Sequence, residues 1–545
     1  MVASGHELAS KAGVEVMRQG GNAVDAAVAT GFALAVVLPE AGNLGGGGFM
    51  LLRLADGKTS FIDFREKAPA TATHDMYLDA KGNVLPDASV VGYRAIAVPG
   101  SVAGLAYAKK KFGKLTLAQV MAPAIRLASQ GFVLSPRDAR QFRDPSLAVF
   151  PESRRIFQRD GRYYRPGDIF KQPELAQTLE RIAADPESFY HGALAQELAA
   201  SIQKGGGLIT AKDLGAYEAK EREPVHGSYR GYEIVSAPPP SSGGIALIEL
   251  LNILEGYDLA KLENGSAESV HLIAEAFRRA FFDRAELLGD PDFTSVPVAA
   301  LLDKRYAAAW RETLDPHRAS RSAELRRPSQ VFEKLDRVAA VREPDHTTHY
   351  SVVDSAGNAV AVTTTLNDLF GSRVTAEGLG FLLNDEMDDF TSKPGEPNMF
   401  GLLQGEANAI GSGKRPLSAM APTIVLKDGQ LSLVLGSRGG PRIITAVAEV
   451  VVDVIDYRMN IQQAVEAPRF HHQWMPDVLR VEKDGFSPAT GNRLAAMGHK
   501  IQEGYTERRK WHARWGDVEG VAVDPKTGER LGANDSRYEG KAVGY

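Results

Sequence analysis

Two adjacent threonines, Thr347 and Thr348, open the stretch whose residue types and spacing could do chemistry. An apolar run, Tyr350–Val353, follows them, and Ser-Ala-Gly-Asn at 355–358 has the composition of a turn. A second run, Ala359–Thr365, is rich in Val and Thr. Two runs of β-branched residues on either side of a turn predict a β-hairpin.

The hairpin would bring two hydroxyl groups together. With the turn centred between Ala356 and Gly357, Thr347 faces Leu366. A loop one residue longer places Thr347 opposite Thr365 instead. In either register Thr365 lies within one residue of Thr347 across the ladder, where side chains are close enough to interact.

A threonine hydroxyl is a poor nucleophile unless a base stands beside it, and one such base is the threonine's own α-amino group. A free α-amino group has a pKa of about 7.7–8.0, so a useful fraction is unprotonated near neutral pH. This chemistry requires cleavage of the chain between His346 and Thr347. The alternative is that the threonines only begin a strand, as β-branched residues often do, and these residues alone favour that alternative.

Motifs along the whole chain change this balance. They are GNAVDAAVATGFALAV, AGNLGGGGFM, DFREKAPA, PPPSSGG, GDPDF, TTHYSVVD, VTTTLN, LNDEMDDF, KRPLSAM, GSRGG and APRFHHQW. Together they resemble the γ-glutamyltransferases, N-terminal-nucleophile hydrolases that cut themselves before the first threonine of TTHYSVVD. The resemblance extends over nearly the whole chain, from near Met1 to Tyr545.

The resemblance implies the catalytic residues. Thr347 would be the nucleophile, with its own amine as the base, and Thr365 would orient it. The backbone amides of Gly439 and Gly440 would form the oxyanion hole, which requires N–H groups that no side chain obstructs.

The resemblance also implies how the glutamyl group is bound. Arg65 and Ser418 would hold the α-carboxylate, and the planar guanidinium can grip it with two hydrogen bonds. Asn367, Glu386 and Asp389 would hold the α-ammonium group, since paired carboxylates suit a cation.

Three positions depart from the family pattern. Ala419 stands where the family usually has a second serine that grips the α-carboxylate, and alanine offers only its backbone. Phe400 replaces a tyrosine of related bacterial enzymes, and Arg438 replaces a frequent proline beside the oxyanion glycines.

Composition excludes several classes of site. The 545 residues include no cysteine, which excludes disulfides, thiolate metal sites and a cysteine nucleophile. The net charge of −5 gives no reason to expect nucleic acid as a partner. The acidic run 385–389 lacks EF-hand spacing, and adjacent His471 and His472 would point to opposite faces of a strand. We therefore expect neither a metal nor a cofactor.

The sequence also predicts the elements that position these residues. We expect a helix over 8–17, a second helix that Asn22 caps, helices over 175–184, 245 onward and 266–288, and strands over 49–54, 61–66 and 431–436. The four glycines at 45–48 lack the spacing of a phosphate-binding loop and indicate close approach of two backbones.

No secretory signal is visible, and the apolar run Ala23–Val37 is shorter than the roughly 20 residues of a membrane span. The chain opens inside what resembles the family's first helix. Because family members are commonly exported, we expect a periplasmic or secreted protein whose leader is missing from this chain.

The resemblance implies a four-layer αββα sandwich of mixed α/β class. Self-cleavage would yield a large subunit, 1–346, and a small subunit, 347–545, that associate around one core. The expected activity transfers the γ-glutamyl group of glutathione and related compounds to water, amino acids or peptides. One alternative is a glutaryl or cephalosporin acylase of the same fold; Glu386 and Asp389 argue against it, because they would face no cation. The other alternative is an unprocessed, inactive solute-binding protein.

Overall fold

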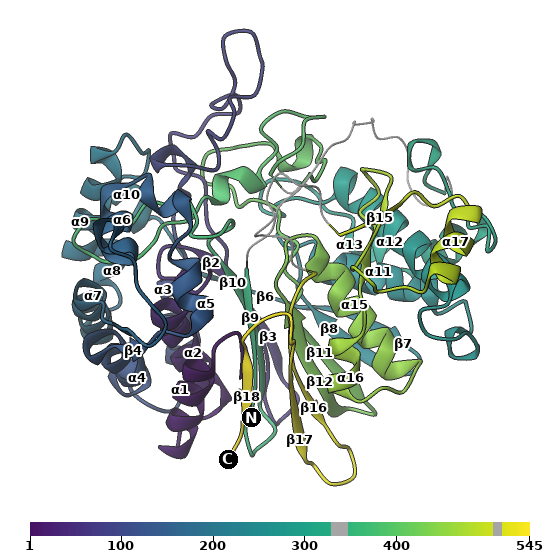
Figure 1. The fold of residues 1–545 in the computed structure, drawn as a ribbon, viewed down its shortest axis with the longest axis horizontal. Coiled ribbons are helices and arrows are strands. Elements are labelled where there is room, and N and C mark those ends of the chain that lie inside the picture. Colours follow the sequence, from purple (N-terminus) through teal and green to yellow (C-terminus); the bar gives the residue numbers. More distant parts are fainter. Residues whose placement is uncertain (329–346, 400, 505–514) are drawn as a thin grey trace.

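Two stacked antiparallel sheets form the centre of the computed structural model, and helices cover both outer faces (Figure 1). The structure describes residues 1–328, 347–399, 401–504 and 515–545. The position of Phe400 lies outside these ranges, as does His346. The two stacked sheets and the helices on their outer faces confirm the predicted four-layer αββα arrangement.

The first sheet contains the predicted hairpin. Its seven strands run in the order β18-β1-β9-β10-β2-β3-β6. Their bounds are β1 (Val2–Ser4), β2 (Gly47–Arg53), β3 (Thr59–Phe64), β6 (Lys220–Arg222), β9 (Thr348–Val353), β10 (Ala359–Thr365) and β18 (Lys541–Val543).

The second sheet has six strands in the order β17-β16-β12-β11-β8-β7. Their bounds are β7 (Val225–Tyr229), β8 (Tyr232–Ser236), β11 (Thr423–Lys427), β12 (Gln430–Ser437), β16 (Val518–Val523) and β17 (Arg530–Asn534). Two small sheets complete the strands, one of β4 (Phe132–Val133) and β5 (Ile169–Phe170), the other of β13 (Phe470–His471), β14 (Leu479–Val481) and β15 (Ile501–Glu503).

Helices from the first 215 residues cover the first sheet, and later helices cover the second (Figure 1). The first group is α1 (Glu7–Arg18), α2 (Ala23–Val37), α3 (Ser101–Phe112), α4 (Leu117–Gln130), α5 (Pro136–Gln141), α6 (Pro151–Gln158), α7 (Pro173–Ala184), α8 (Ser188–His191), α9 (Ala193–Lys204) and α10 (Ala211–Gly215). The second group is α11 (Gly243–Leu254), α12 (Ala267–Leu287), α13 (Val298–Leu301), α14 (Lys304–Glu312), α15 (Arg442–Ile455), α16 (Ile461–Glu466) and α17 (Pro488–Ala496).

Strand β2 contributes side chains to two hydrophobic cores, one on each face of the first sheet. Phe49 and Leu51 join the apolar cluster shared with the second sheet, whereas Met50 and Leu52 join the cluster beneath the first group of helices. Successive side chains of a strand point to opposite faces, so a strand buried on both faces must be apolar at nearly every position. This explains the unbroken apolar run from Phe49 to Leu52 in β2.

Helix α2 is enclosed on all sides. Asn22 caps it through a reciprocal pair of hydrogen bonds with Asp25, as the sequence predicted in placing Asn22 at its start. All 15 of its residues are buried. Within the described ranges, no helix combines the length and apolar character needed to cross a membrane.

The hairpin adopts the longer of its two predicted loops. Ala359 pairs with Val353 and Thr364 with Thr348, so the register that opposed Thr347 to Leu366 is wrong, and Thr347 lies opposite Thr365. The side chain of Asp354 explains the choice, because it accepts hydrogen bonds from the amides of residues 356 and 358 and so includes the whole segment 354–358 in the loop.

Candidate active site

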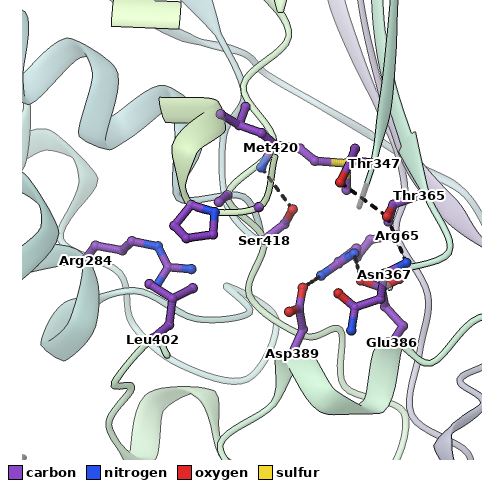
Figure 2. Close-up of a pocket in the computed structure, with 14 residues that line it drawn as sticks. Arg65, Arg284, Thr347, Thr365, Asn367, Glu386, Asp389, Leu402, Ser418 and Met420 are labelled. Carbon is purple, nitrogen blue, oxygen red and sulfur yellow. Dashed lines mark hydrogen bonds and ion pairs between the residues drawn. The ribbon is translucent and has the colours of Figure 1, made fainter. Parts of the chain in front are cut away.

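The two threonines of the hairpin meet in a small pocket between the sheets (Figure 2). Thr347 directly precedes β9, Thr365 ends β10, and their Oγ1 atoms lie 3.4 Å apart. Both side chains are buried. Thr365 Oγ1 also accepts a 2.8 Å hydrogen bond from the amide of Asn367, which fixes the direction of its hydroxyl beside Thr347.

The pocket brings together nine of the ten predicted site residues. Its cavity volume is about 20 Å³, room for about one water molecule. Its lining is Arg65, Arg284, Thr347, Thr365, Asn367, Glu386, Asp389, Leu402, Ser418, Ala419, Met420, Gly440, Pro441 and Ile443.

The glycine run 45–48 allows the chain to pass close to the end of β10. A β-carbon on Gly46 would overlap the carbonyl oxygen of Thr365, and one on Gly47 would lie 2.6 Å from Glu66 Oε2. Asn43 Nδ2 also donates to the Thr365 carbonyl at 2.8 Å. The predicted close backbone approach is confirmed.

Arg65 lies fully buried at the centre of a charged cluster. It forms ion pairs with Glu386 and Asp389, contacts Glu66 at 3.5 Å, and donates from Nε to the Pro416 carbonyl at 3.2 Å. The acids therefore face a cation without any substrate. The argument that a glutaryl acylase would leave Glu386 and Asp389 with no cation is wrong, because buried charges require partners and the protein supplies one itself.

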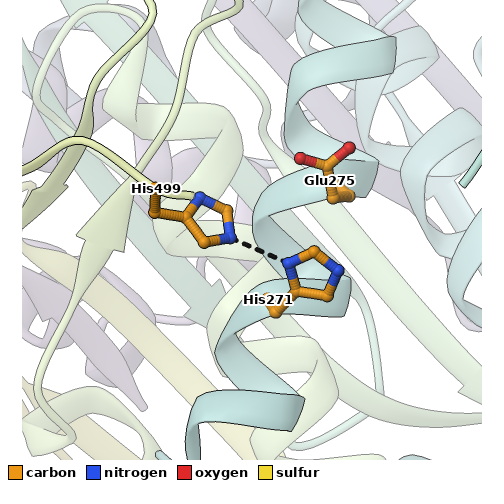
Figure 3. A group of neighbouring side chains, drawn as sticks. All are labelled: His271, Glu275 and His499. Atoms are coloured by element: carbon orange, nitrogen blue, oxygen red, sulfur yellow. Dashed lines mark hydrogen bonds between the residues drawn. The ribbon is translucent and has the colours of Figure 1, made fainter. Parts of the chain in front are cut away.

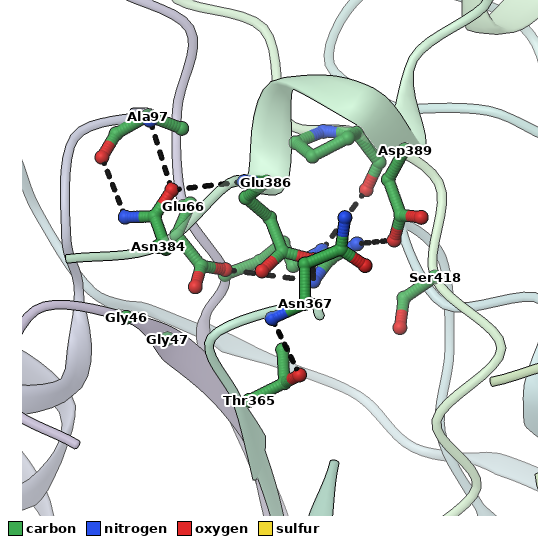
Figure 4. Close-up of polar contacts among 12 residues, drawn as sticks. Gly46, Gly47, Glu66, Ala97, Thr365, Asn367, Asn384, Glu386, Asp389 and Ser418 are labelled. Atoms are coloured by element: carbon green, nitrogen blue, oxygen red, sulfur yellow. Dashed lines mark hydrogen bonds and ion pairs between the residues drawn. The ribbon is translucent and has the colours of Figure 1, made fainter. Parts of the chain in front are cut away.

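The acidic turn Glu386–Asp389 is held in place by Asn384 (Figure 4). Asn384 Oδ1 accepts from the amides of Glu386 and Ala97, at 3.0 and 2.9 Å. Its Nδ2 donates to the carbonyls of Ala97 and Gly45, both at 2.8 Å. One buried amide thus connects the acidic turn to two segments that precede the hairpin.

Burial shifts the protonation of the carboxylates around Arg65. Burial raises the pKa of Glu66 to about 7, against the attraction of Arg65. The same cause raises the pKa of Glu386 well above its usual range and also raises that of Asp389. Three carboxylates share one guanidinium here, so the cluster retains a proton near neutral pH.

Ser418 and Ala419 line the pocket from the segment that precedes β11. The Ser418 hydroxyl accepts from the Met420 amide at 3.1 Å, which leaves its own proton for a ligand. The Ser418 amide donates to the Pro240 carbonyl at 2.9 Å, and Ser242 binds the Ser418 carbonyl. The PPPSSGG turn therefore supports the segment that carries Ser418 and Ala419.

The two predicted oxyanion glycines follow β12 and precede α15. Gly439 and Gly440 have φ angles of +124° and +50°, which glycine adopts without strain. Gly440 lines the pocket, whereas Gly439 lies behind it against Gly516. Their position at the start of a 14-residue helix favours developing negative charge, because helix amides and the helix dipole point there.

Arg438 is buried behind these glycines. Its guanidinium lies 4.2 Å from the ring centre of Tyr538, and its Nε lies 3.3 Å from Asp517 Oδ1. Arg137 covers the same Tyr538 ring at 3.6 Å. A stacked guanidinium thus anchors the loop of Gly439 and Gly440 to the C-terminal segment.

Arg284 is a lining residue that the sequence analysis missed. It lies on α12, one part of its surface faces the pocket, and its Nε donates to Ser242 Oγ at 2.8 Å. The sequence offered no clear signal for it, because charged residues, Asp283 and Glu286, flank Arg284 in α12.

The histidines expected to bind no metal do point apart. His471 contacts Thr445 and Gln473, and His472 contacts Asp477. The structure groups other possible ligands, the buried His271, Glu275 and His499 (Figure 3).

These three side chains already have partners. His271 Nδ1 and His499 Nε2 are hydrogen-bonded at 2.8 Å, and Glu275 is paired with Arg278 and Arg279. We interpret the group as a buried hydrogen-bond network.

Comparison with known proteins identifies the family of the chain. The model of the gamma-glutamyltranspeptidase family matches residues 9–545. The chain belongs to this family. It is 52% identical over 506 residues to the glutathione hydrolase proenzyme of Pseudomonas sp. strain A14, covering 92% of this chain and 86% of that one. It is 49% identical over 541 residues to the glutathione hydrolase proenzyme of Escherichia coli K12, covering 98% and 90%.

Solved structures of related proteins share the fold. A cephalosporin acylase from Bacillus halodurans aligns with a TM-score of 0.84 at 28% identity, over 99% of this chain and 94% of that one. A chain of Helicobacter pylori γ-glutamyltranspeptidase aligns with a TM-score of 0.59 at 45% identity, over 61% of this chain and 96% of its own length.

Proposed function

We propose that this γ-glutamyltranspeptidase family member cleaves itself before Thr347 and then uses Thr347 to transfer the γ-glutamyl group of glutathione and related amides. The observation that carries the proposal is the contact of the Thr347 and Thr365 hydroxyls in a pocket whose far wall holds buried charges of both signs. Relatives named glutathione hydrolase, at 49% and 52% identity, support the donor class.

The first chemical step joins the donor to the protein. Thr347 Oγ1 attacks the γ-carbonyl carbon, and the α-amine of Thr347 takes the hydroxyl proton. The amides of Gly439 and Gly440 stabilise the tetrahedral oxyanion. The C–N bond then breaks, and the leaving amine takes the proton from the Thr347 ammonium, which leaves a γ-glutamyl ester on Thr347.

The second step releases the glutamyl group. Water, an amino acid or a peptide attacks the ester carbonyl and gives its proton to the same α-amine. Thr347 Oγ1 leaves and is reprotonated, so one amine serves as base and acid in turn.

The charged cluster explains recognition of the glutamyl ammonium group. Glu386 and Asp389 lie on the pocket wall beside Asn367, and all three are buried. An incoming ammonium group adds a second cation to a cluster with an excess of carboxylates. It therefore favours the fully ionised acids and releases the proton that they hold.

The proposed cut would not separate the two subunits. Strands β9 and β10 of residues 347–545 pair with β1 and β2 of residues 1–346 within one sheet. In the second sheet β11 pairs with β8 across the same division. A hydrogen-bonded and buried interface of this kind supports one shared core after cleavage.

We propose that the protein is periplasmic or secreted.

A denaturing gel with mass spectrometry tests the proposal together with an assay on γ-glutamyl-p-nitroanilide. We expect two fragments and release of p-nitroaniline. A single band with no turnover would instead support the unprocessed solute-binding protein.

A second candidate activity is removal of glutaryl groups from β-lactam side chains. The pairing of Arg65 with Glu386 and Asp389 favours it, because the two acids keep a cationic partner when the donor has no amine. Comparison of kcat/KM for γ-glutamyl and glutaryl p-nitroanilides decides between the two, and we expect the γ-glutamyl donor to be preferred.

A further inference from the structure

A second arginine on the pocket wall has unused hydrogen-bonding capacity. Arg284 is 1% exposed, and its Nη1 has no hydrogen-bond partner among the described residues. Figure 2 shows its guanidinium beside Leu402, across the pocket from Thr365 and Asn367. A buried donor without a partner is costly to keep, so such a group in a binding pocket points to a ligand.

Arg65, by contrast, is already occupied. Its Nη1 and Nη2 are taken by the ion pairs with Glu386 and Asp389, and its Nε donates to a backbone carbonyl. It can turn toward a carboxylate only after a donor's ammonium group has taken over the two acids. Arg284 needs no such exchange.

The orientation of Arg284 is fixed relative to the segment that carries Ser418. Arg284 Nε donates to Ser242 Oγ at 2.8 Å, and Ser242 Oγ donates in turn to the Ser418 carbonyl at 2.6 Å. The Ser242 amide donates to the same carbonyl at 2.8 Å. One serine therefore holds the guanidinium and the backbone of Ser418 together.

The neighbouring residue creates the need for another donor. Ala419 lines the same pocket and offers no hydroxyl. An ionised carboxylate has about four lone-pair sites, and Ser418 can supply one proton. A guanidinium fork fills more than one of the remaining sites.

We propose that Arg284 binds the α-carboxylate of the γ-glutamyl donor directly, together with Ser418, at the position that a second hydroxyl at residue 419 would otherwise serve. This assignment rests on the proposed γ-glutamyl activity. Burial lowers the pKa of Arg284 to about 10, so it stays protonated at neutral pH and can pair with an anion. The residue would thus determine specificity for donors that carry a carboxylate.

The test compares three p-nitroanilide donors. The γ-glutamyl donor has both charged groups, the glutaryl donor has only the carboxylate, and the 4-aminobutyryl donor has only the amine. In Arg284→Gln we expect kcat/KM for the first two to fall about 10- to 150-fold relative to the third, the usual worth of a hydrogen bond to a charged group. Ala419→Ser should raise kcat/KM for the γ-glutamyl donor by a larger factor in the Arg284→Gln variant than in the native enzyme.

Arg279→Gln is the matched control. It lies on the same helix and is equally buried, but it pairs with Glu275 away from the pocket. We expect it to lower the melting temperature without changing the ratios among donors. If either glutamine variant does not fold, the corresponding lysine variant is compared. Arg284→Lys should change the ratios of kcat/KM among the donors in the same direction, but to a smaller extent.

Calorimetric binding of glutamate and 4-aminobutyrate gives a readout that needs no turnover. Arg284→Gln should weaken glutamate about 10- to 150-fold and leave the affinity for 4-aminobutyrate within twofold. Equal losses for both ligands, or unchanged donor ratios, would overturn the role of Arg284. Failure of the native enzyme to cleave the γ-glutamyl donor would overturn the proposed activity instead.

Discussion

Replacing Asp389 with Asn tests how the pocket recognises the glutamyl ammonium group. Asp389 Oδ2 pairs with Arg65, while Oδ1 contacts Asn398 Nδ2 at 3.5 Å within the described part of the chain and can accept from a ligand. The substitution keeps the shape and removes the charge. A lost hydrogen bond between charged groups costs about 1.5–3 kcal/mol, which corresponds to roughly 10- to 150-fold in KM for γ-glutamyl donors.

The assay is the ratio of kcat/KM for γ-glutamyl and glutaryl p-nitroanilides, since only the former presents an ammonium group. Asp389→Asn should shift this ratio toward the glutaryl donor by that factor. Asp388→Asn is the control, because Asp388 lies in the same turn but is held by Ser89 and the Met399 amide outside the pocket lining. The same ratio in Asp389→Asn as in the native enzyme would refute the assignment.

Three further predictions follow from the same contacts. Thr365→Ala should slow both self-cleavage and turnover, by roughly 10²–10⁴-fold if it orients the proton transfer, as followed on denaturing gels and by p-nitroaniline release; normal maturation with full activity would remove it from the mechanism. Because the pKa of Glu66 is raised to about 7 from 4.5, the folded state binds more protons than the unfolded state between these values. The contribution of Glu66 to stability is therefore present below pH 4.5 and lost as pH rises through about 7. In urea titrations, the free energy of unfolding of Glu66→Gln should depend less on pH over this range than that of the native protein. Tyr538→Phe keeps the ring that stacks on Arg438 and should keep kcat, whereas Tyr538→Leu should lower kcat several-fold with little change in KM; equal effects of both variants would contradict the role of stacking.

The sequence predicts the scaffold of the site well because its signals are local. Valine- and threonine-rich runs around a turn specify the hairpin, and Asn22 with Asp25 specifies the start of α2. The loop length was not decided by composition, because it depends on which amides Asp354 binds.

The sequence could not predict how the charges pair. Arg65 lies more than 300 positions from Glu386 and Asp389, and only the fold shows that they pair before any ligand arrives. Arg284 was missed for a related reason, since its proposed role comes from an N–H that has no partner among the described residues, in a pocket lined by eight separate stretches of the chain.

The most direct test of the central claim is the N-terminal sequence of the smaller fragment of the purified protein. The account predicts a fragment of residues 347–545 that begins Thr-Thr-His-Tyr, and a Thr347→Ala variant that remains one inactive chain. A fragment that begins elsewhere, or cleavage of Thr347→Ala without added protease, would contradict Thr347 as the nucleophile.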